Sequence, residues 1–160
     1  MILQKAYQIA KTELRSCYDD FGIVAGRGHY EDYWTRDAAF GCLGAIELGD
    51  IEIVEKNLNL LASFQRKDGM IPFLIRKFLP WFSFFNLKIK IRLKPKFRSH
   101  KVLYLSEVVD SNPYFVIIFA QLVRETENKK LLEEYASNVQ AALLWCLRTV
   151  SYTHLTLPTK

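Results

Sequence analysis

A two-residue link, Gly49-Asp50, separates two stretches of helical apolar periodicity and restricts how this chain can fold. The first stretch runs from Arg36 to Leu48 and the second continues to Phe64, each with apolar residues at a period of about 3.6. Glycine favours the end of a helix, and aspartate can cap the start of the next one. So short a connection forces the two predicted helices into an antiparallel hairpin.

Helical periodicity also marks three other stretches of the chain. It predicts helices at residues 2–17, 113–127 and 129–149. The helix at 113–127 is expected to have an N-cap among Asp110, Ser111 and Asn112, with Pro113 at its first position. Half of the 160 residues are apolar, which is enough for a sizeable core in one domain. We therefore expect an all-α fold built from successive helical hairpins.

The positive charge of the chain is concentrated in one segment. Nine of the 22 basic residues lie between Arg76 and Lys101, and no acidic residue occurs from Gly69 through Ser106. The other 13 basic residues are outnumbered by the 17 acidic ones, so the remainder has a net charge of −4. A nucleic-acid-binding domain would spread basic residues over one face of its fold. We therefore expect no nucleic-acid partner.

The same region reads as a long insertion between predicted helices, at residues 76–104. Residues 88–94 alternate between cationic and apolar side chains and predict a short strand. The aromatic residues from Phe78 to Phe85 fit either an amphipathic helix at a membrane surface or an excursion that covers the end of a helical barrel. We favour the barrel cover and expect no membrane partner, and the apolar run is too short to span a bilayer.

Several other kinds of site are excluded by the sequence. The glycines at 22, 26 and 28 lack the order of a dinucleotide-binding loop and the Lys-Ser ending of a phosphate-binding loop, so no nucleotide is expected. Cys17, Cys42 and Cys146 are far apart, as expected of free thiols rather than of disulfides or metal ligands. The N-terminal residues lack the apolar core of a signal peptide, so we expect a cytoplasmic protein.

Residues 33–37, Tyr-Trp-Thr-Arg-Asp, combine side chains that suit a sugar. The flat C–H face of a pyranose packs on an aromatic ring such as that of Trp34, while its hydroxyls bond to charged groups. Arg36 only donates hydrogen bonds and Asp37 only accepts them, so together they can hold neighbouring hydroxyls and orient each other. A structural interpretation is also open, in which Arg36 and Asp37 form a buried ion pair between hairpins and Trp34 packs in the core.

Four short motifs follow one another along the sequence in a fixed order. W-T-R-D at residues 34–37 is followed by G-A-I-E-L-G-D at 44–50, Q-x-x-D-G-x-I-P at 65–72 and V-V-D-S-N-P at 108–113. This order is similar to that of the six-hairpin glycosidases, which include glucoamylases, amylo-α-1,6-glucosidases, trehalases and neutral invertases. The resemblance covers residues 29–148, and W-T-R-D with the downstream Q-x-x-D-G-x-I-P is its specific part.

The resemblance implies an inverting glycoside hydrolase that acts on α-glucosidic linkages of an oligosaccharide or a glycogen-like polymer, without a cofactor or a metal. Arg36 and Asp37 would bind hydroxyls of the sugar next to the scissile bond. Tyr33, Trp34 and Asp110 are further candidate substrate-binding residues, although Asp110 is equally well interpreted as a plain N-cap. Inversion needs an acid and a base about 6.5 to 9.5 Å apart. In these families both lie on later loops, beyond the matched part.

A complete toroid of this superfamily has twelve helices in six hairpins, so the helices predicted here would form a partial (α/α)6 toroid. We expect residues 1–150 to be the N-terminal part of such a domain, truncated and inactive alone. Residues 151–160 break the helical pattern and are expected to be a non-native tail. The alternative function is a non-catalytic helical binding or membrane-surface module that uses the basic aromatic segment. Neither hypothesis predicts an oligomeric state.

Overall fold

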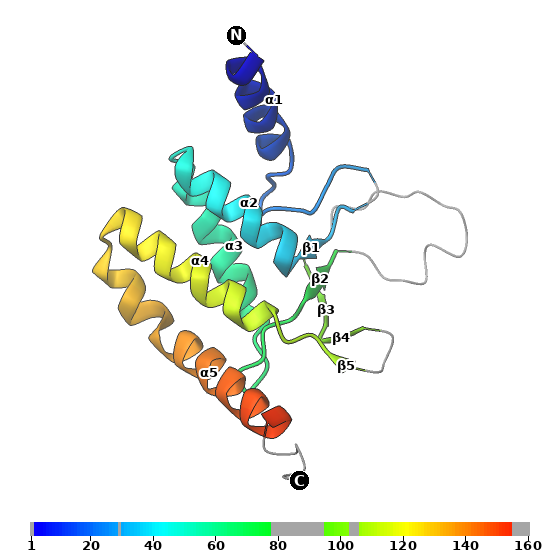
Figure 1. Cartoon of the computed structure of the whole chain (residues 1–160), viewed down its shortest axis with the longest axis vertical. Helices are drawn as coiled ribbons and strands as arrows, with labels where there is room; N and C mark the ends of the chain where they lie inside the picture. Colours follow the sequence, from blue (N-terminus) through cyan, green and yellow to red (C-terminus); the bar gives the residue numbers. More distant parts are fainter. Residues whose placement is uncertain (1, 29, 78–94, 103–105, 155–160) are drawn as a thin grey trace, which may run out of the picture.

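The computed structural model describes residues 2–28, 30–77, 95–102 and 106–154, and these are predominantly helical (Figure 1). All five predicted helices are present. Their bounds, with those of the short strands, are α1 (Ile2–Ser16), β1 (Tyr33–Trp34), α2 (Thr35–Glu47), α3 (Ile51–Ser63), β2 (Leu74–Arg76), β3 (Phe97–Ser99), β4 (Lys101–Val102), β5 (Ser106–Glu107), α4 (Ser111–Thr126) and α5 (Lys129–His154).

The α2–α3 hairpin forms as the sequence predicts. Leu48 is the C-cap of α2, and Gly49 follows with a φ of 74°, a left-handed conformation that glycine adopts without strain. The amides of Gly49 and Asp50 donate to carbonyls of the last turn of α2, both at 2.9 Å, which closes the helix end. The Asp50 carboxylate makes no capping bond to α3 and is ion-paired with Arg15 instead.

A second hairpin joins α4 to α5. Helix α4 begins at Ser111, two residues earlier than predicted, so Pro113 occupies its third position. Proline is tolerated there because the first amides of a helix have no partner within it. Glu127 ends α4 with a left-handed φ of 50°, and the Asn128 side chain caps α5 by accepting a hydrogen bond from the amide of Lys130 at 3.1 Å.

Helix α5 is longer than predicted. It continues to His154, so the expected break of the helical pattern at residue 151 is wrong. No glycine or proline occurs between Lys129 and Leu157, and Pro158 is the first residue that is incompatible with a continuing helix. The weak apolar periodicity after residue 149 therefore does not end the helix.

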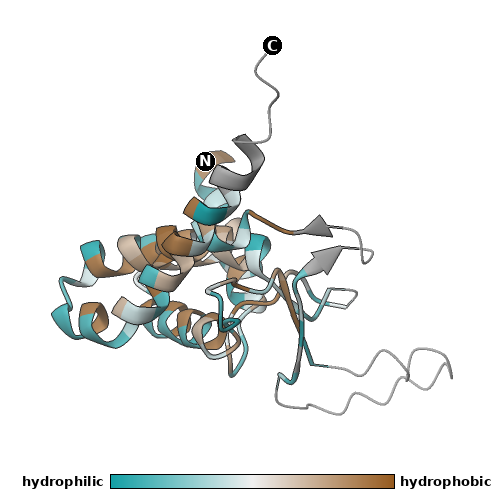
Figure 2. Ribbon diagram, turned by 90° about the horizontal axis from the view of Figure 1, so that it is seen from below, coloured by the Kyte–Doolittle hydropathy of each residue, from teal (hydrophilic) through white to brown (hydrophobic). Residues whose placement is uncertain are grey.

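Helices α2 and α4 lie side by side and begin at the same end of the molecule (Figure 1). Arg36, in the first turn of α2, is ion-paired with Asp110 directly before α4, and about one turn further on the rings of Phe40 and Tyr114 are 5.6 Å apart. The two helices are therefore parallel. Helix α3 packs against both, and α5 packs against α4. Apolar residues gather between these four helices (Figure 2), among them Val54, Leu58, Leu61, Phe115, Ile118 and Leu122.

Helix α1 differs from the other helices because none of its residues is buried. Ile2 and Leu3 are 83% and 86% exposed. Leu14, in its last turn, packs against α2, where the absence of side chains at Gly41 and Gly44 leaves room for it. Helix α1 therefore projects from the rest of the molecule (Figure 1).

Short strands correct the all-α expectation. Strands β1, β2 and β3 form an antiparallel sheet in which Trp34 pairs with Leu74, and Ile75 with Arg98; β4 pairs with β5. Strand β2 ends at Arg76, the first residue of the predicted insertion, and β3 lies inside that insertion at residues 97–99, so the β2–β3 ladder joins its first residue to a segment near its end. These strands have only two or three residues and are defined by their pairing with one another. Apolar periodicity along the sequence does not reveal such pairing, so they were not predicted.

Two expectations for the insertion lie outside the described residues. These are the strand at 88–94 and the amphipathic aromatic run at 78–85, and both stay predictions, as does the membrane-surface alternative that depends on them. Among the helices that the structure describes, none combines the length and the apolar character needed to cross a bilayer.

Candidate functional site

The candidate site lies where two helix starts meet, at residues 74 positions apart in the sequence. The Nε atom of Arg36 donates to Oδ2 of Asp110 at 2.8 Å, and Nη2 lies 2.5 Å from the same oxygen. The Arg36 side chain is 62% exposed and that of Asp110 33%. This ion pair holds the first turn of α2 against the segment that precedes α4.

A pocket of about 330 Å³ opens beside this ion pair, near the lower end of the range for small-molecule sites. Its walls come from the β1–α2 junction, the residue before β2 and the segment that leads into α4. The lining residues are Trp34, Arg36, Asp37, Phe73, Val108, Asp110 and Ser111. Four of the five residues predicted from the sequence therefore line one hollow.

Phe73 is a pocket residue that the sequence analysis missed. Its ring meets the ring of Trp34 edge to face, with centroids 5.8 Å apart and planes at 62°. Backbone hydrogen bonds fix its position, because Thr35 donates to the Phe73 carbonyl at 2.9 Å and the Phe73 amide donates to Ser99 at 3.0 Å. The available signal was its place directly after Pro72, the last residue of the Q-x-x-D-G-x-I-P motif.

Tyr33 does not line the pocket, which corrects the prediction. Tyr33 and Trp34 are consecutive residues of β1, and consecutive side chains of a strand point to opposite faces. Because Trp34 lines the pocket, Tyr33 points into the interior, where it is 0% exposed. Its hydroxyl donates to the carboxylate oxygens of Asp19, at 2.7 and 2.9 Å.

Tyr33 belongs to a largely buried charged cluster beside the start of the insertion. Lys77 is ion-paired with Asp19, and its ammonium lies 4.7 Å from the centre of the Tyr33 ring. Burial raises the pKa of the Asp19 carboxyl, but hydrogen bonds from Lys77, the Phe21 amide and Tyr33 together bring that pKa below its usual value. Burial and the bond to Asp19 raise the pKa of Tyr33. The cluster therefore ties β1 and the end of β2 to the loop after α1.

Arg36 and Asp37 do not orient each other, contrary to the prediction. The guanidinium is bonded to Asp110, and no described residue forms an ion pair or hydrogen bond with the Asp37 carboxylate. Asp37 lies in the first turn of α2, where the helix dipole favours an anion. The alternative of a buried Arg36–Asp37 pair is also wrong, since both residues are exposed, although Arg36 does link two hairpins. Asp110 occupies the N-cap position without a side-chain capping bond.

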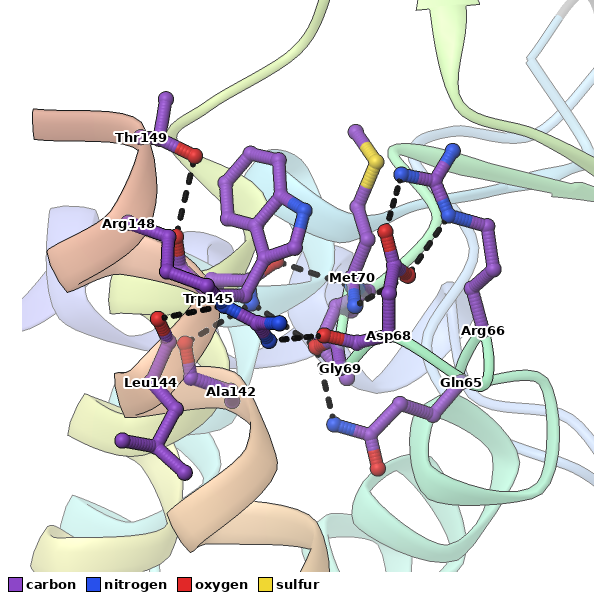
Figure 3. A network of polar contacts seen from close by, with 12 residues as sticks. Gln65, Arg66, Asp68, Gly69, Met70, Ala142, Leu144, Trp145, Arg148 and Thr149 are labelled. Carbon is purple, nitrogen blue, oxygen red and sulfur yellow. Dashed lines mark hydrogen bonds and ion pairs between the residues drawn. The ribbon is translucent and has the colours of Figure 1, made fainter. Parts of the chain in front are cut away.

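The Q-x-x-D-G-x-I-P motif has a different role, since none of residues 65–72 lines the pocket. Its residues form polar contacts with α5 (Figure 3). The Gln65 side chain donates to the carbonyls of Gly69 and Asn138, at 3.0 and 2.9 Å. Gly69 has a φ of 99°, and a Cβ there would lie 2.1 Å from the carbonyl oxygen of Ala141. The motif therefore holds the loop after α3 against α5.

Asp68 completes this network through both its side chain and its backbone (Figure 3). Its carboxylate is ion-paired with Arg66 at 2.6 Å, and the hydrogen bonds from Arg66 lower the pKa of Asp68 to about 2. Its carbonyl accepts a hydrogen bond from Arg148 of α5 at 2.7 Å. Asp68 is therefore a structural residue of this loop.

The W-T-R-D and Q-x-x-D-G-x-I-P motifs are joined to each other inside the molecule. The Thr35 hydroxyl donates to the Pro72 carbonyl at 2.5 Å, in a fully buried position. Asn112, also fully buried, accepts from the Ile71 amide and donates to two carbonyls, at distances of 2.8, 2.9 and 3.1 Å. These bonds hold the first turn of α4 against the same loop. The segments that line the pocket are therefore positioned by the buried hydrogen bonds of Thr35 and Asn112.

A larger hollow, of about 700 Å³, lies between the end of α1 and the start of α3. Its main charged groups are bonded to one another, since Arg15 makes two hydrogen bonds to Asp50 at 2.7 and 2.8 Å and Tyr18 makes a third at 3.1 Å. The bonds from Arg15 in particular lower the pKa of Asp50. Asp20 also lines this hollow and, like Asp37, forms no ion pair or hydrogen bond with a described residue, so what distinguishes the pocket at the helix starts is the pair of rings of Trp34 and Phe73 beside its charged groups.

The remaining sequence predictions concern thiols and metals. Cys17, Cys42 and Cys146 are free, as predicted, and burial raises the pKa of the Cys42 thiol. Within the described ranges, no three His, Cys, Asp or Glu side chains lie close enough together to hold a metal ion.

A scan of the chain against protein-family models, and searches of curated proteins and of solved structures, found no match. The assignment of a function therefore depends on the sequence motifs and on the chemistry of the pocket.

Proposed function

We propose that this chain forms the substrate-binding part of an inverting glycoside hydrolase that acts on α-glucosidic linkages of an oligosaccharide or a glycogen-like polymer. The observation that carries the proposal is the pocket at the starts of α2 and α4, which gathers an indole, a guanidinium and two carboxylates from distant segments. Trp34, Arg36 and Asp37 suit a sugar by their chemistry, and Asp110 is a candidate through the family resemblance; the meeting of Asp110 with the other three in one pocket supports the proposal.

The pocket offers a pyranose both apolar and polar contacts. The rings of Trp34 and Phe73 meet edge to face, so one ring can take the C–H face of the sugar while the other bounds its edge. Arg36 keeps N–H donors that Asp110 does not use, and the Asp37 carboxylate is an open acceptor. A sugar hydroxyl both donates and accepts, so neighbouring hydroxyls can bond to both groups at once.

The arrangement of the helices supports a partial (α/α)6 toroid. Helices α2 and α4 are parallel neighbours, and each is followed by an antiparallel partner, as expected of the inner and outer helices of adjacent hairpins. Leu132, Leu143 and Leu147 of α5 are 45%, 46% and 64% exposed. In a complete toroid such a surface would be covered by a further hairpin. We therefore propose that α2–α3 and α4–α5 are two adjacent hairpins of six.

Within this proposal, Asp37 holds substrate and is neither the acid nor the base. An inverting reaction needs two carboxyl groups about 6.5 to 9.5 Å apart, on opposite faces of the sugar ring. Asp110 is occupied by Arg36, so the two carboxylates of the pocket serve to bind and to balance charge. The proposal therefore assigns the acid and the base to segments outside this chain.

Substituting Asp37 by Asn tests the proposal. Asparagine keeps the shape of the side chain but removes its charge and one acceptor, and a hydrogen bond to a charged group contributes about 1.5 to 3 kcal/mol. The affinity for maltotriose should therefore fall at least about tenfold. The affinity is measured by NMR titration of the chain, following the indole resonance of Trp34.

Asp20→Asn is the matched control, because Asp20 is exposed and no described residue pairs with it. This variant should bind maltotriose as the unmodified chain does. Equal affinity in Asp37→Asn, or no binding of maltotriose by the unmodified chain, would contradict the proposal. Binding to anionic vesicles that is lost on neutralising lysines 88–96 but kept in Asp37→Asn would instead support the membrane-surface hypothesis.

A further inference from the structure

The residues that line the pocket carry more negative than positive charge. Asp37 and Asp110 are its carboxylates, and Arg36 is the guanidinium among them. The two Arg36 nitrogens that meet Asp110 both meet one oxygen, Oδ2, at 2.8 and 2.5 Å. The charge of Arg36 is therefore matched within the protein, while the Asp37 carboxylate has no partner among the described residues.

The helix dipoles do not reverse this balance. Helices α2 and α4 both begin at the pocket, and a helix N-terminus carries about half a positive charge. Each of these starts already has a carboxylate of its own, Asp37 in the first turn of α2 and Asp110 at the N-cap position of α4. Neither helix therefore presents an unbalanced positive end to an anionic ligand.

We infer that the pocket selects uncharged pyranoses over sugar acids, and that Asp110 sets this selectivity by holding Arg36. The inference rests on the proposed function and names the charge class of its sugar. A uronic acid has a carboxylate where the neutral sugar has its C6 hydroxymethyl group, so it adds a negative charge to a pocket in which Asp37 is unpaired and the charge of Arg36 is already matched by Asp110. Asp110 is thus a positioning residue that acts through Arg36.

A matched pair of ligands tests the inference. Methyl α-D-glucopyranoside and the corresponding methyl α-D-glucuronoside differ only at C6, and NMR titration of the Trp34 indole resonance gives the affinity for each. At low ionic strength the neutral sugar should bind about tenfold more tightly. The carboxylate of the glucuronoside and that of Asp37 have like charges and repel each other within the pocket. Added salt should narrow the ratio of the two affinities, because it screens that repulsion.

Variants separate the contribution of Asp110 from that of net charge. Asp110→Asn leaves the charge of Arg36 without an anionic partner and should bring the ratio close to one or reverse it, whereas Arg36→Gln should widen it. Asp20→Asn makes the same change in net charge outside the pocket and should leave the ratio unchanged. If Asp110→Asn does not fold, as judged by its circular dichroism, the salt series and Arg36→Gln decide the question.

The outcomes distinguish this inference from the proposed function. Binding of the glucuronoside as tightly as the neutral sugar would overturn the inference while the proposed function stood. An unchanged ratio in Asp110→Asn, or an equal change in Asp20→Asn, would overturn the role of Asp110. Failure of both sugars to bind would contradict the proposed function and, with it, the inference.

Discussion

The two motifs that the sequence marks as a pair have opposite environments in the fold. W-T-R-D presents Arg36 and Asp37 to a pocket, whereas Q-x-x-D-G-x-I-P directs Gln65 and Gly69 into contacts with α5. The buried bond from Thr35 to Pro72 joins them, so one motif forms the pocket wall and the other its support. A motif can therefore stand out in a sequence while few of its residues are placed to touch a ligand.

Replacing Gly69 by Ala should have the largest effect on the supporting motif. The new Cβ would lie 2.1 Å from the Ala141 carbonyl oxygen at a φ of 99°, so the loop must move away from α5. We expect a loss of at least about 3 kcal/mol in the free energy of unfolding, measured by urea denaturation. Gly49→Ala is the control, because it is strained at φ 74° but has free space around its Cβ, and it should cost about 1 kcal/mol. Equal losses in the two variants would contradict this account.

Replacing Asn112 by Ala should be the next largest change. It removes three buried hydrogen bonds and leaves an amide and two carbonyls without that partner, so the free energy of unfolding should fall by about 3 kcal/mol. Thermal unfolding followed by circular dichroism measures the loss. Asn59→Ala, at an exposed position, should stay within about 0.5 kcal/mol. A small effect at Asn112 would mean that the pocket does not depend on the interior network.

Acid should weaken the supporting motif slightly through Asp68. The Arg66 hydrogen bonds lower its pKa to about 2 from an ordinary 3.8, so the folded state binds fewer protons than the unfolded one between these values. Its contribution to stability is therefore complete above about pH 4 and is lost as the pH falls towards 2. Because the side chain is 41% exposed, the contribution is at most about 1 kcal/mol.

Urea unfolding of the unmodified chain and of Asp68→Asn, from pH 7 to pH 2, measures this contribution. The difference in stability between the two proteins should shrink as the pH falls from 4 to 2. A difference that stays constant over this range would show that the Asp68 charge does not stabilise the loop.

Most of the helical architecture could be predicted because its signals are local. Helix α2 was predicted at 36–48 and spans Thr35–Glu47, since its apolar period is sustained and Gly49 marks its end. Helix α1 was predicted equally well, at 2–17 against Ile2–Ser16, yet its lack of buried residues was not foreseen. A periodic stripe identifies an apolar face but not the partner that covers it.

The parts of the site that could not be predicted depend on contacts between distant residues. The partner of Arg36 lies 74 positions away, so the sequence suggested its neighbour Asp37 instead. The strand that turns Tyr33 inward and Trp34 towards the pocket has only two residues, too few for an alternating pattern. Phe73 becomes a pocket residue through backbone bonds to two other segments, which its own neighbourhood does not indicate.

The ladder between β2 and β3 has a consequence for the long insertion. Arg76 is paired with Phe97, and the Lys96 amide donates to the Arg76 carbonyl at 3.2 Å, so the two points of the insertion that bound residues 77–95 are held together. Paired antiparallel residues lie about 5 Å apart, a gap that even a two-residue turn can close. Segments of very different length can therefore replace the residues between Arg76 and Phe97 while Trp34 and Phe73 keep their places.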